Sequence, residues 1–168
     1  MELKDYVAEA LTRNRNGTLN AVKGLTQKQL DWRPSPQANS IGFLLWHIAR
    51  GEDGLLNRWA FGSKEAWATG GWDKKIQLPS DKPMGEWTAA DLGRFTPALA
   101  DLLAYMSAVR ESSLAALKKL DMGRLGEHPR PDRPEWSVAT LLQIGVGHEA
   151  HHQGAIEYLV GLMKSQGV

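Results

Sequence analysis

Residues 137–164 read SVATLLQIGVGHEAHHQGAIEYLVGLMK, and this segment decides the fold. Its apolar residues recur at steps of three and four, which is the period of an α-helix with one buried face. Ser137 stands where an N-cap is expected, and Gly167 follows shortly after the end of the segment. The segment therefore predicts a long amphipathic helix with an apolar stripe of Val138, Leu141, Leu142, Gly145, Ile156, Leu159 and Met163.

Two segments upstream have the same period. The first runs from about Leu3 to Val22. The second is expected to begin at an N-cap, Asn39 or Ser40, because both side chains can accept a backbone N–H bond. Gly62 is the predicted end of this second helix, since glycine readily adopts the left-handed conformation that ends helices.

A further helical segment spans about Thr88 to Leu120 and is interrupted at Thr96-Pro97. Threonine followed by proline is typical of an N-cap and a first helical position, so we expect a short lead-in helix and then the main one. No segment alternates as a strand does. The pattern predicts an all-α fold, a four-helix bundle, in a single domain covering residues 1–168. Long connections leave the order of helix directions open.

Residues 63–86 contain Gly70-Gly71, Pro79 and Pro83 and lack a helical period. A loop of this length is either functional or mobile, or it is a surface wrap packed by its own aromatic side chains. Residues 126–135 are rich in proline and predict a rigid linker.

The composition excludes several classes of protein and partner. The chain has 168 residues, 42% of them apolar, and a formal net charge of +1. These values exclude a disordered chain and give no reason to expect nucleic acid or an anionic membrane as a partner. The absence of cysteine excludes disulfides, thiolate zinc sites and a cysteine nucleophile. No apolar run is long enough to span a membrane and no signal peptide is evident, so we expect a cytoplasmic protein.

Three histidines are candidates for metal ligands. His148 and His152 lie on the apolar stripe of the last helix with i, i+4 spacing, which puts both imidazoles on one face. His47 lies on the inward flank of the second helix, and helices in a bundle pack about 8–10 Å apart. The three rings would bind a divalent ion and leave an open position, which is the pattern of a catalytic site. His151 and His128 are expected at the surface or outside the ligand set.

Other residues near these histidines have several interpretations. Glu52, one turn beyond His47, is a candidate catalytic residue that orients a ligand, or else a solvated helix charge. Gly145 and Gly147 weaken the last helix, which a close approach by a neighbouring element would explain. Arg33 and residues 63–86 are candidates for substrate contact.

Two alternatives compete with the three-histidine site. A histidine on an apolar stripe is commonly a core residue satisfied by an ordinary hydrogen bond. In addition, the segment from His148 through Glu149 to His152 matches the HExxH pattern of zinc proteases. The lack of strands and of an evident substrate cleft argues against a protease.

Two stretches resemble the DinB/YfiT-like superfamily of metalloproteins. They are Trp32-Arg33-Pro34-Ser35-Pro36 with the following Asn39-Ser40-Ile41-Gly42 and Trp46-His47-Ile48-Ala49, and the segment from His148 to Gly154. The resemblance implies a four-helix bundle with a long crossover connection. It also implies a zinc, nickel or iron ion, with zinc and nickel as leading candidates, held by His47, His148 and His152.

The resemblance further implies a thiol-dependent chemistry. Members with an assigned activity transfer low-molecular-weight thiols, such as bacillithiol or mycothiol, to electrophiles, or isomerise maleylpyruvate with a thiol cofactor. A small-molecule thiol is therefore the expected cosubstrate, an electrophile the other substrate, and a homodimer the expected assembly. Metal-dependent hydrolysis and a non-enzymatic metal- or ligand-binding role in stress response are the alternatives.

Overall fold

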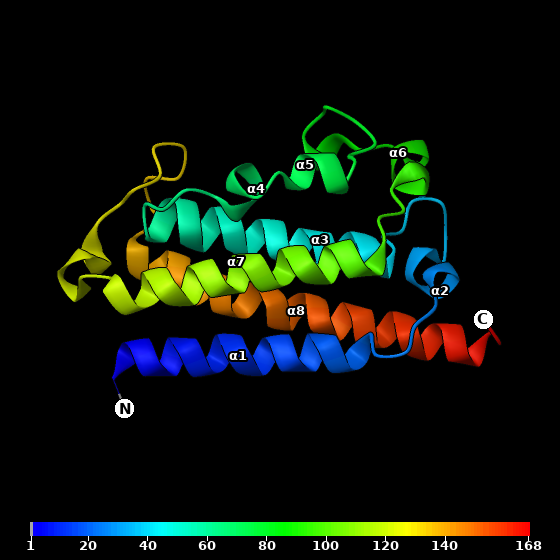
Figure 1. Cartoon of the computed structure of the whole chain (residues 1–168), viewed down its shortest axis with the longest axis horizontal. Coiled ribbons are helices and arrows are strands. Elements are labelled where there is room, and N and C mark those ends of the chain that lie inside the picture. The colour runs from blue at the N-terminus through cyan, green and yellow to red at the C-terminus, as the bar shows by residue number, and fades with distance from the viewer. Residues whose placement is uncertain (1) are drawn as a thin grey trace.

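Four long helices lie side by side in the computed structural model, which describes residues 2–168 (Figure 1). They are α1 (Leu3–Ala21), α3 (Ile41–Glu52), α7 (Leu99–Lys119) and α8 (Val138–Ser165). Within the described range the chain forms no strand. The predictions of an all-α fold and a four-helix bundle are therefore confirmed. None of the helices in residues 2–168 combines the length and the apolar character needed to cross a membrane.

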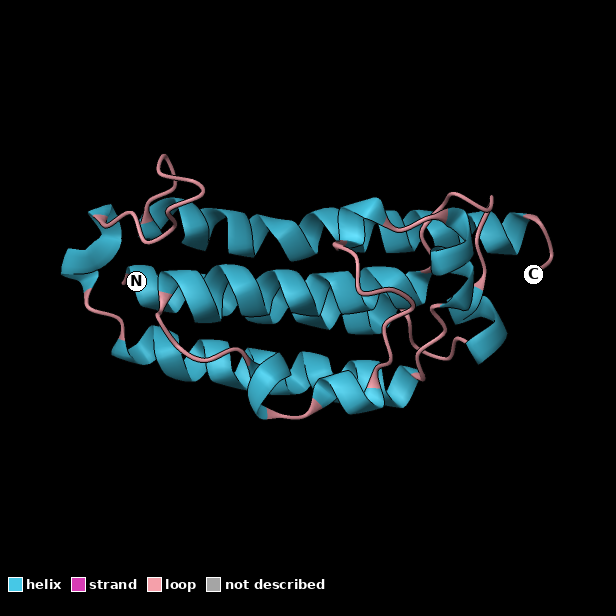
Figure 2. Ribbon diagram, turned by 90° about the horizontal axis from the view of Figure 1, so that it is seen from above, coloured by secondary structure: helices cyan, strands magenta, loops and turns pink. Residues whose placement is uncertain are grey.

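The helix directions are not those of a simple up-down-up-down bundle. α1 and α8 run one way, and α3 and α7 run the other way (Figure 1), and the view from above shows the long helices lying along a common axis (Figure 2). Asn14 of α1 donates to the carbonyl of Val146 in α8 at 2.8 Å. Ser113 of α7 donates to Asn57 Oδ1, just beyond α3, at 3.1 Å. Because α3 and α7 are parallel, the chain between them must return along the length of the bundle, which confirms the long crossover.

The crossover is more ordered than its sequence suggests. It contains α4 (Ala66–Thr69), α5 (Trp72–Lys75), the 3₁₀ turn η2 (Met84–Glu86) and α6 (Ala89–Arg94). The prediction that residues 63–86 lack helix is wrong at α4, α5 and η2, whereas α6 confirms the predicted short lead-in helix. Buried Asp53 accepts hydrogen bonds from the backbone N–H groups of Ala66 and Trp67, both at 2.9 Å, and so caps the first turn of α4. This capping partner is distant in sequence, so local periodicity did not reveal it.

The predicted caps of two long helices are confirmed. Ser40 Oγ accepts from the backbone N–H of Phe43, and Ser137 Oγ accepts from that of Thr140, both at 3.1 Å. After Glu52 the helix continues as the π-helix η1 (Asp53–Ala60). Gly62 follows with a φ of +67°, as expected for the residue that stops a helix.

The predicted N-cap of α7 at Thr96 is wrong. Ala98 is the N-cap, and its carbonyl accepts from the N–H groups of Asp101 and Leu102, both at 3.1 Å. The carbonyl of Pro97 is instead hydrogen-bonded by the side chain of Gln27 at 3.2 Å. Helical bonding therefore begins later than the local sequence indicates.

Two short helices were not predicted. They are α2 (Gln27–Asp31) and the 3₁₀ turn η3 (Met122–Gly126). α2 starts with a capping box between Thr26 and Gln29, a signal that the sequence does contain.

Buried apolar residues form two clusters along the bundle. One contains Leu45, Ile48, Tyr105 and Ile156, and the other contains residues such as Leu11. On each long helix a buried charged residue lies in sequence between members of the two clusters: Arg15, Glu52, Arg110 and Glu149. A polar layer thus crosses the interior of the bundle, next to the histidines described below.

Candidate metal centre

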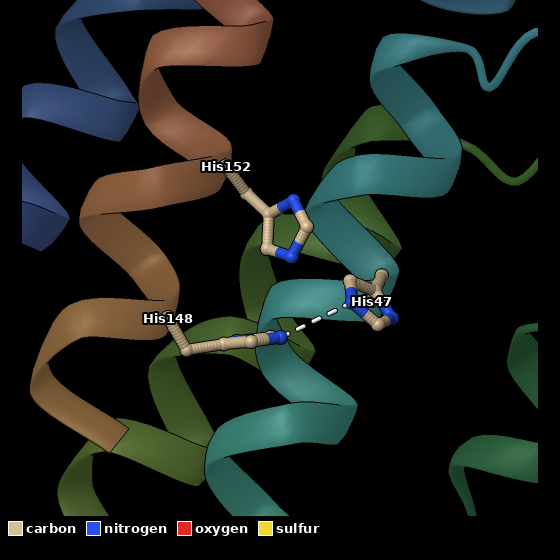
Figure 3. Close-up of side chains that lie close together, drawn as sticks. All are labelled: His47, His148 and His152. Atoms are coloured by element: carbon tan, nitrogen blue, oxygen red, sulfur yellow. Dashed lines mark hydrogen bonds between the residues drawn. The ribbon is translucent and has the colours of Figure 1, made fainter. Parts of the chain in front are cut away.

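His47 is held on α3 by its own helix and by an aromatic neighbour. Its side chain is partly buried on the side of α3 that faces α8 (Figure 3). The ring of Phe43, one turn earlier, lies parallel to the imidazole, with ring centroids 5.9 Å apart and planes inclined by 9°. This stacking restricts the orientation of the imidazole.

α8 supplies two more imidazoles on the facing side. The spacing of His148 and His152 puts their rings on adjacent turns, with centroids 4.6 Å apart. The His47 ring lies 4.8 Å from that of His148 and 4.6 Å from that of His152, measured between centroids. Figure 3 shows the three side chains pointing toward one another from two helices. The structure therefore brings together all three histidines singled out from the sequence.

The spacing of the ring nitrogens suits a single ion. One nitrogen from each ring lies within 4.8 Å of the other two, and Nε2 of His47 is 3.1 Å from Nε2 of His148. Two nitrogens that each lie about 2.0–2.1 Å from a tetrahedral zinc are about 3.3 Å apart. Three imidazoles form a donor set suited to zinc, nickel or iron. The residues fit such an ion, and their role as ligands stays a prediction.

The surroundings of the rings favour their neutral form. Burial, with a smaller contribution from the neighbouring imidazoles, lowers the pKa of His47, His148 and His152 to about 4. The charge of Glu52 acts in the opposite direction on His148. At neutral pH each ring therefore carries an unprotonated nitrogen, and neutral imidazole is the form that binds metal ions.

The crossover reaches the site through Met84. Nδ1 of His47 lies 3.1 Å from the thioether sulfur of Met84. A proton on Nδ1 can be donated to this weak acceptor, which leaves the Nε2 lone pair directed at the other two rings. Met84 thus favours the tautomer that a metal site requires.

Gly51 makes room for His148. A Cβ atom at position 51 would lie 2.8 Å from Nδ1 of His148 and closer still to Cε1. Only glycine at this position lets the ring lie against α3. The sequence pattern alone does not reveal this role of Gly51.

Substituting alanine for Gly51 is expected to push the His148 ring away from the other two. Metal affinity should fall at least tenfold, and chelator competition measures this loss. The higher helix propensity of alanine should add about 0.5–1 kcal/mol to the free energy of unfolding, which urea denaturation measures. Gly147→Ala is the matched control, because no atom lies within 4 Å of a Cβ there. Equal metal affinity in Gly51→Ala and the wild type would contradict this account.

The two glycines noted on α8 differ in their surroundings. A Cβ at Gly145 would lie 2.5 Å from a methyl group of Leu56, so close packing explains this glycine as predicted. The same explanation is wrong for Gly147, where a Cβ would meet open space.

Beside the histidines lies a buried network of two arginines and two glutamates. Glu52 accepts from Nε and Nη2 of Arg110, both at 2.8 Å, and from Nη2 of Arg15 at 3.0 Å. Glu149 accepts from Nε of Arg15 at 2.7 Å and from Nη2 of Arg110 at 2.6 Å. The four side chains come from α1, α3, α7 and α8 and balance in charge. We call them the ionic quartet.

The quartet determines what its two carboxylates can do. Burial disfavours the charged form of Glu52, yet hydrogen bonds and charge from Arg110 and then Arg15 keep the pKa of Glu52 below its ordinary value. Within residues 2–168, Glu52 makes no hydrogen bond to the three histidines, and it influences His148 through its charge. Its role in orienting a ligand stays a prediction.

The same contacts bear on the protease alternative. In an HExxH protease the glutamate acts as a general base beside the ion. Here both carboxylate oxygens of Glu149 are engaged by Arg15 and Arg110. The match to the protease pattern is therefore one of sequence letters and not of arrangement.

The remaining sequence candidates lie outside the cluster. His151 is exposed, with its ring 5.2 Å from that of His152, and His128 is exposed in the linker after η3. Arg33 donates to the carbonyls of Pro36 at 2.5 Å and of Ala89 at 3.3 Å.

A pocket of about 340 Å³ opens beside His47. Its lining residues come from α3 and from the crossover: Trp46, His47, Arg50, Gly51, Leu78, Lys82, Met84 and Trp87. The volume is in the range of small-molecule sites. A larger groove of about 740 Å³ lies between α1 and α7 and includes none of the three histidines. The chemistry is therefore expected in the smaller pocket.

Comparison with known proteins agrees with this architecture. Residues 10–156 match a family model described as the DinB superfamily. A solved structure, that of a conserved protein of locus from Enterococcus faecalis, superposes with a TM-score of 0.86. It is 20% identical in sequence, and the match covers 98% of this chain and 99% of that one. At this identity the likeness establishes the fold alone. No curated protein matches the chain.

Proposed function

Because the chain belongs to the DinB superfamily, whose members in general bind metal, we propose that it is a metal-dependent thiol S-transferase. His47, His148 and His152 hold a divalent ion, zinc or nickel in preference to iron. The observation that carries the proposal is the convergence of three neutral imidazoles beside a pocket of small-molecule size.

The ion supplies positive charge that lowers the pKa of a coordinating thiol, so that thiolate is available at neutral pH. Three protein ligands are typical of a catalytic site with an open position, which a coordinating thiol would occupy. Burial favours the neutral form of the three rings, and Met84 favours the tautomer of His47 with Nε2 free. The pocket beside His47 holds the second substrate close to the sulfur.

In the proposed reaction a bond forms between the thiol sulfur and an electrophilic carbon. The leaving group departs from that carbon with the bonding electron pair, and the thiol proton passes to water. The chain has no cysteine of its own. The nucleophilic sulfur must therefore arrive with the cosubstrate.

The proposal is tested by measuring the conjugation of a panel of small thiols with 1-chloro-2,4-dinitrobenzene. The purified protein is assayed as isolated, after chelation, and after zinc or nickel is restored. Chelation is expected to reduce the thiol-dependent rate at least tenfold, and the ion is expected to restore it. A rate that chelation leaves unchanged, or no turnover with any thiol and electrophile, would refute the proposal. Metal-dependent turnover of an ester without thiol would favour hydrolysis instead.

A further inference from the structure

The pocket beside His47 has a wall that is rich in hydrogen-bond donors. Arg50 and Lys82 line it, and none of the lining residues is acidic. Trp46 also lines it.

Arg50 is fixed in place and retains donors. Its guanidinium lies 3.6 Å from both Asp53 and Glu65 and stacks over the ring of Trp67 at 5.1 Å. One hydrogen bond, to the hydroxyl of Tyr105 at 3.3 Å, uses one of its five N–H groups. The two carboxylates offset the charge of Arg50 but leave several of its N–H donors available.

Lys82 adds a positive charge that no carboxylate of the described residues pairs with at close range. Across residues 2–168, no ion pair within 4.0 Å involves Lys82. Its position is set by the crossover, because the indole N–H of Trp87 donates to the carbonyl of Lys82 at 3.1 Å. Trp87 in turn stacks on Trp46 with ring centroids 5.2 Å apart and planes inclined by 15°.

The rest of the wall is apolar. Leu78 is 42% exposed although it is a large hydrophobic side chain, and it lies beside Met84 and Trp87 around the pocket. An apolar surface of this kind suits the hydrocarbon or aromatic part of a ligand.

The geometry points to an organic anion as the ligand of this pocket, a molecule with an apolar body and a carboxylate. The carboxylate accepts hydrogen bonds from the donors of the wall and pairs with Lys82, while the apolar body packs on Leu78, Met84 and Trp87. This inference rests on the proposed function, because it identifies the pocket as the substrate site of the histidine cluster. Lys82 is then the residue that selects an anionic substrate.

The test uses 3-phenylpropionate and its neutral counterpart 3-phenyl-1-propanol as probes. Binding is followed by quenching of tryptophan fluorescence, since Trp46 and Trp87 line the pocket. The protein is stripped of metal by chelation, so that the carboxylate cannot bind through an ion. Neither probe contains a thiol, so this result is independent of whether the protein transfers thiols.

Wild-type protein is expected to bind the acid about threefold or more tightly than the alcohol, as an exposed ion pair contributes a modest preference. Lys82→Met should abolish the preference. Lys74→Met, the matched control, should retain it, because Lys74 is exposed on the same crossover but does not line the pocket. Leu78→Glu, at an exposed position that the fold tolerates, should weaken binding of the acid more than that of the alcohol. Equal binding of the two probes by the wild type, or an unchanged preference in Lys82→Met, would overturn the inference.

Discussion

Substituting alanine for His148 is expected to remove stoichiometric divalent metal from the purified protein. His148 lies close to both other members of the cluster, with its Nε2 atom 3.1 Å from that of His47 and its ring 4.6 Å from that of His152. Loss of one of three ligands should reduce affinity by more than the 10- to 100-fold that is typical when an outer hydrogen-bond partner is lost. Elemental analysis of the isolated protein measures occupancy, and chelator competition measures affinity.

His151→Ala is the matched control for this substitution. It changes the same residue type on the same helix, three positions away, but His151 is exposed and outside the cluster. Its metal content should equal that of the wild type. Circular dichroism of both variants verifies that the bundle has formed. Undiminished metal in His148→Ala would remove the basis of the proposed site.

The parts of the fold that were predictable depend on local signals. Ser40 and Ser137 stand directly before apolar periods and cap the helices as expected. The missed elements depend on distant partners. α4 forms where Asp53 caps it from another helix, and α7 starts late because Gln27 binds the carbonyl of Pro97. A single sequence read locally does not reveal such contacts.

The residues of the site also divide into those that local sequence signals revealed and those that they did not. The three histidines were found because each interrupts or flanks an apolar stripe, and the family resemblance selected the same trio. Arg15 and Arg110 were missed because a charged residue on a helix is ordinarily solvated. A signal was nevertheless present, since Arg15 follows Leu11 by four positions and Arg110 follows Met106 by four. Both arginines therefore lie on buried faces.

Gly51 shows a second reason why the sequence alone could not predict the whole site. Glycines in a helix suggest close packing, and by this rule Gly145 and Gly147 were expected to accommodate neighbours. Gly51 makes room for His148, whereas Gly147 makes room for nothing within 4 Å. The difference depends on which side of each helix faces its neighbour, and that requires the helix packing to be known.

Glu52→Gln should destabilise the metal-free protein by about 3–5 kcal/mol, as is typical when one member of a buried ion pair is removed. The carboxylate is 4% exposed and accepts from both Arg15 and Arg110, so its loss leaves the ionic quartet with an uncompensated positive charge. Urea denaturation measures the free energy of unfolding. The double variant Glu52→Gln/Arg110→Gln restores charge balance and retains the Arg15–Glu149 pair at 2.7 Å. Its destabilisation should therefore be less than the sum of the two single effects by at least about 0.5 kcal/mol.

Glu127→Gln separates burial from pairing as the cause. Glu127 pairs with Arg124 at 2.8 Å, the same distance as between Arg110 and Glu52, but the Glu127 side chain is 53% exposed. Its loss should change stability by about 1 kcal/mol or less, because solvent screens exposed pairs. If Glu52→Gln were no more destabilising than Glu127→Gln, the quartet would not hold the bundle together.

Metal affinity of the folded Glu52→Gln protein then decides the role predicted for Glu52. A loss of affinity relative to the wild type is expected if the charge of Glu52 helps to orient His148. Unchanged affinity would assign Glu52 to the fold alone, because helices that stay packed would still bring the three imidazoles together.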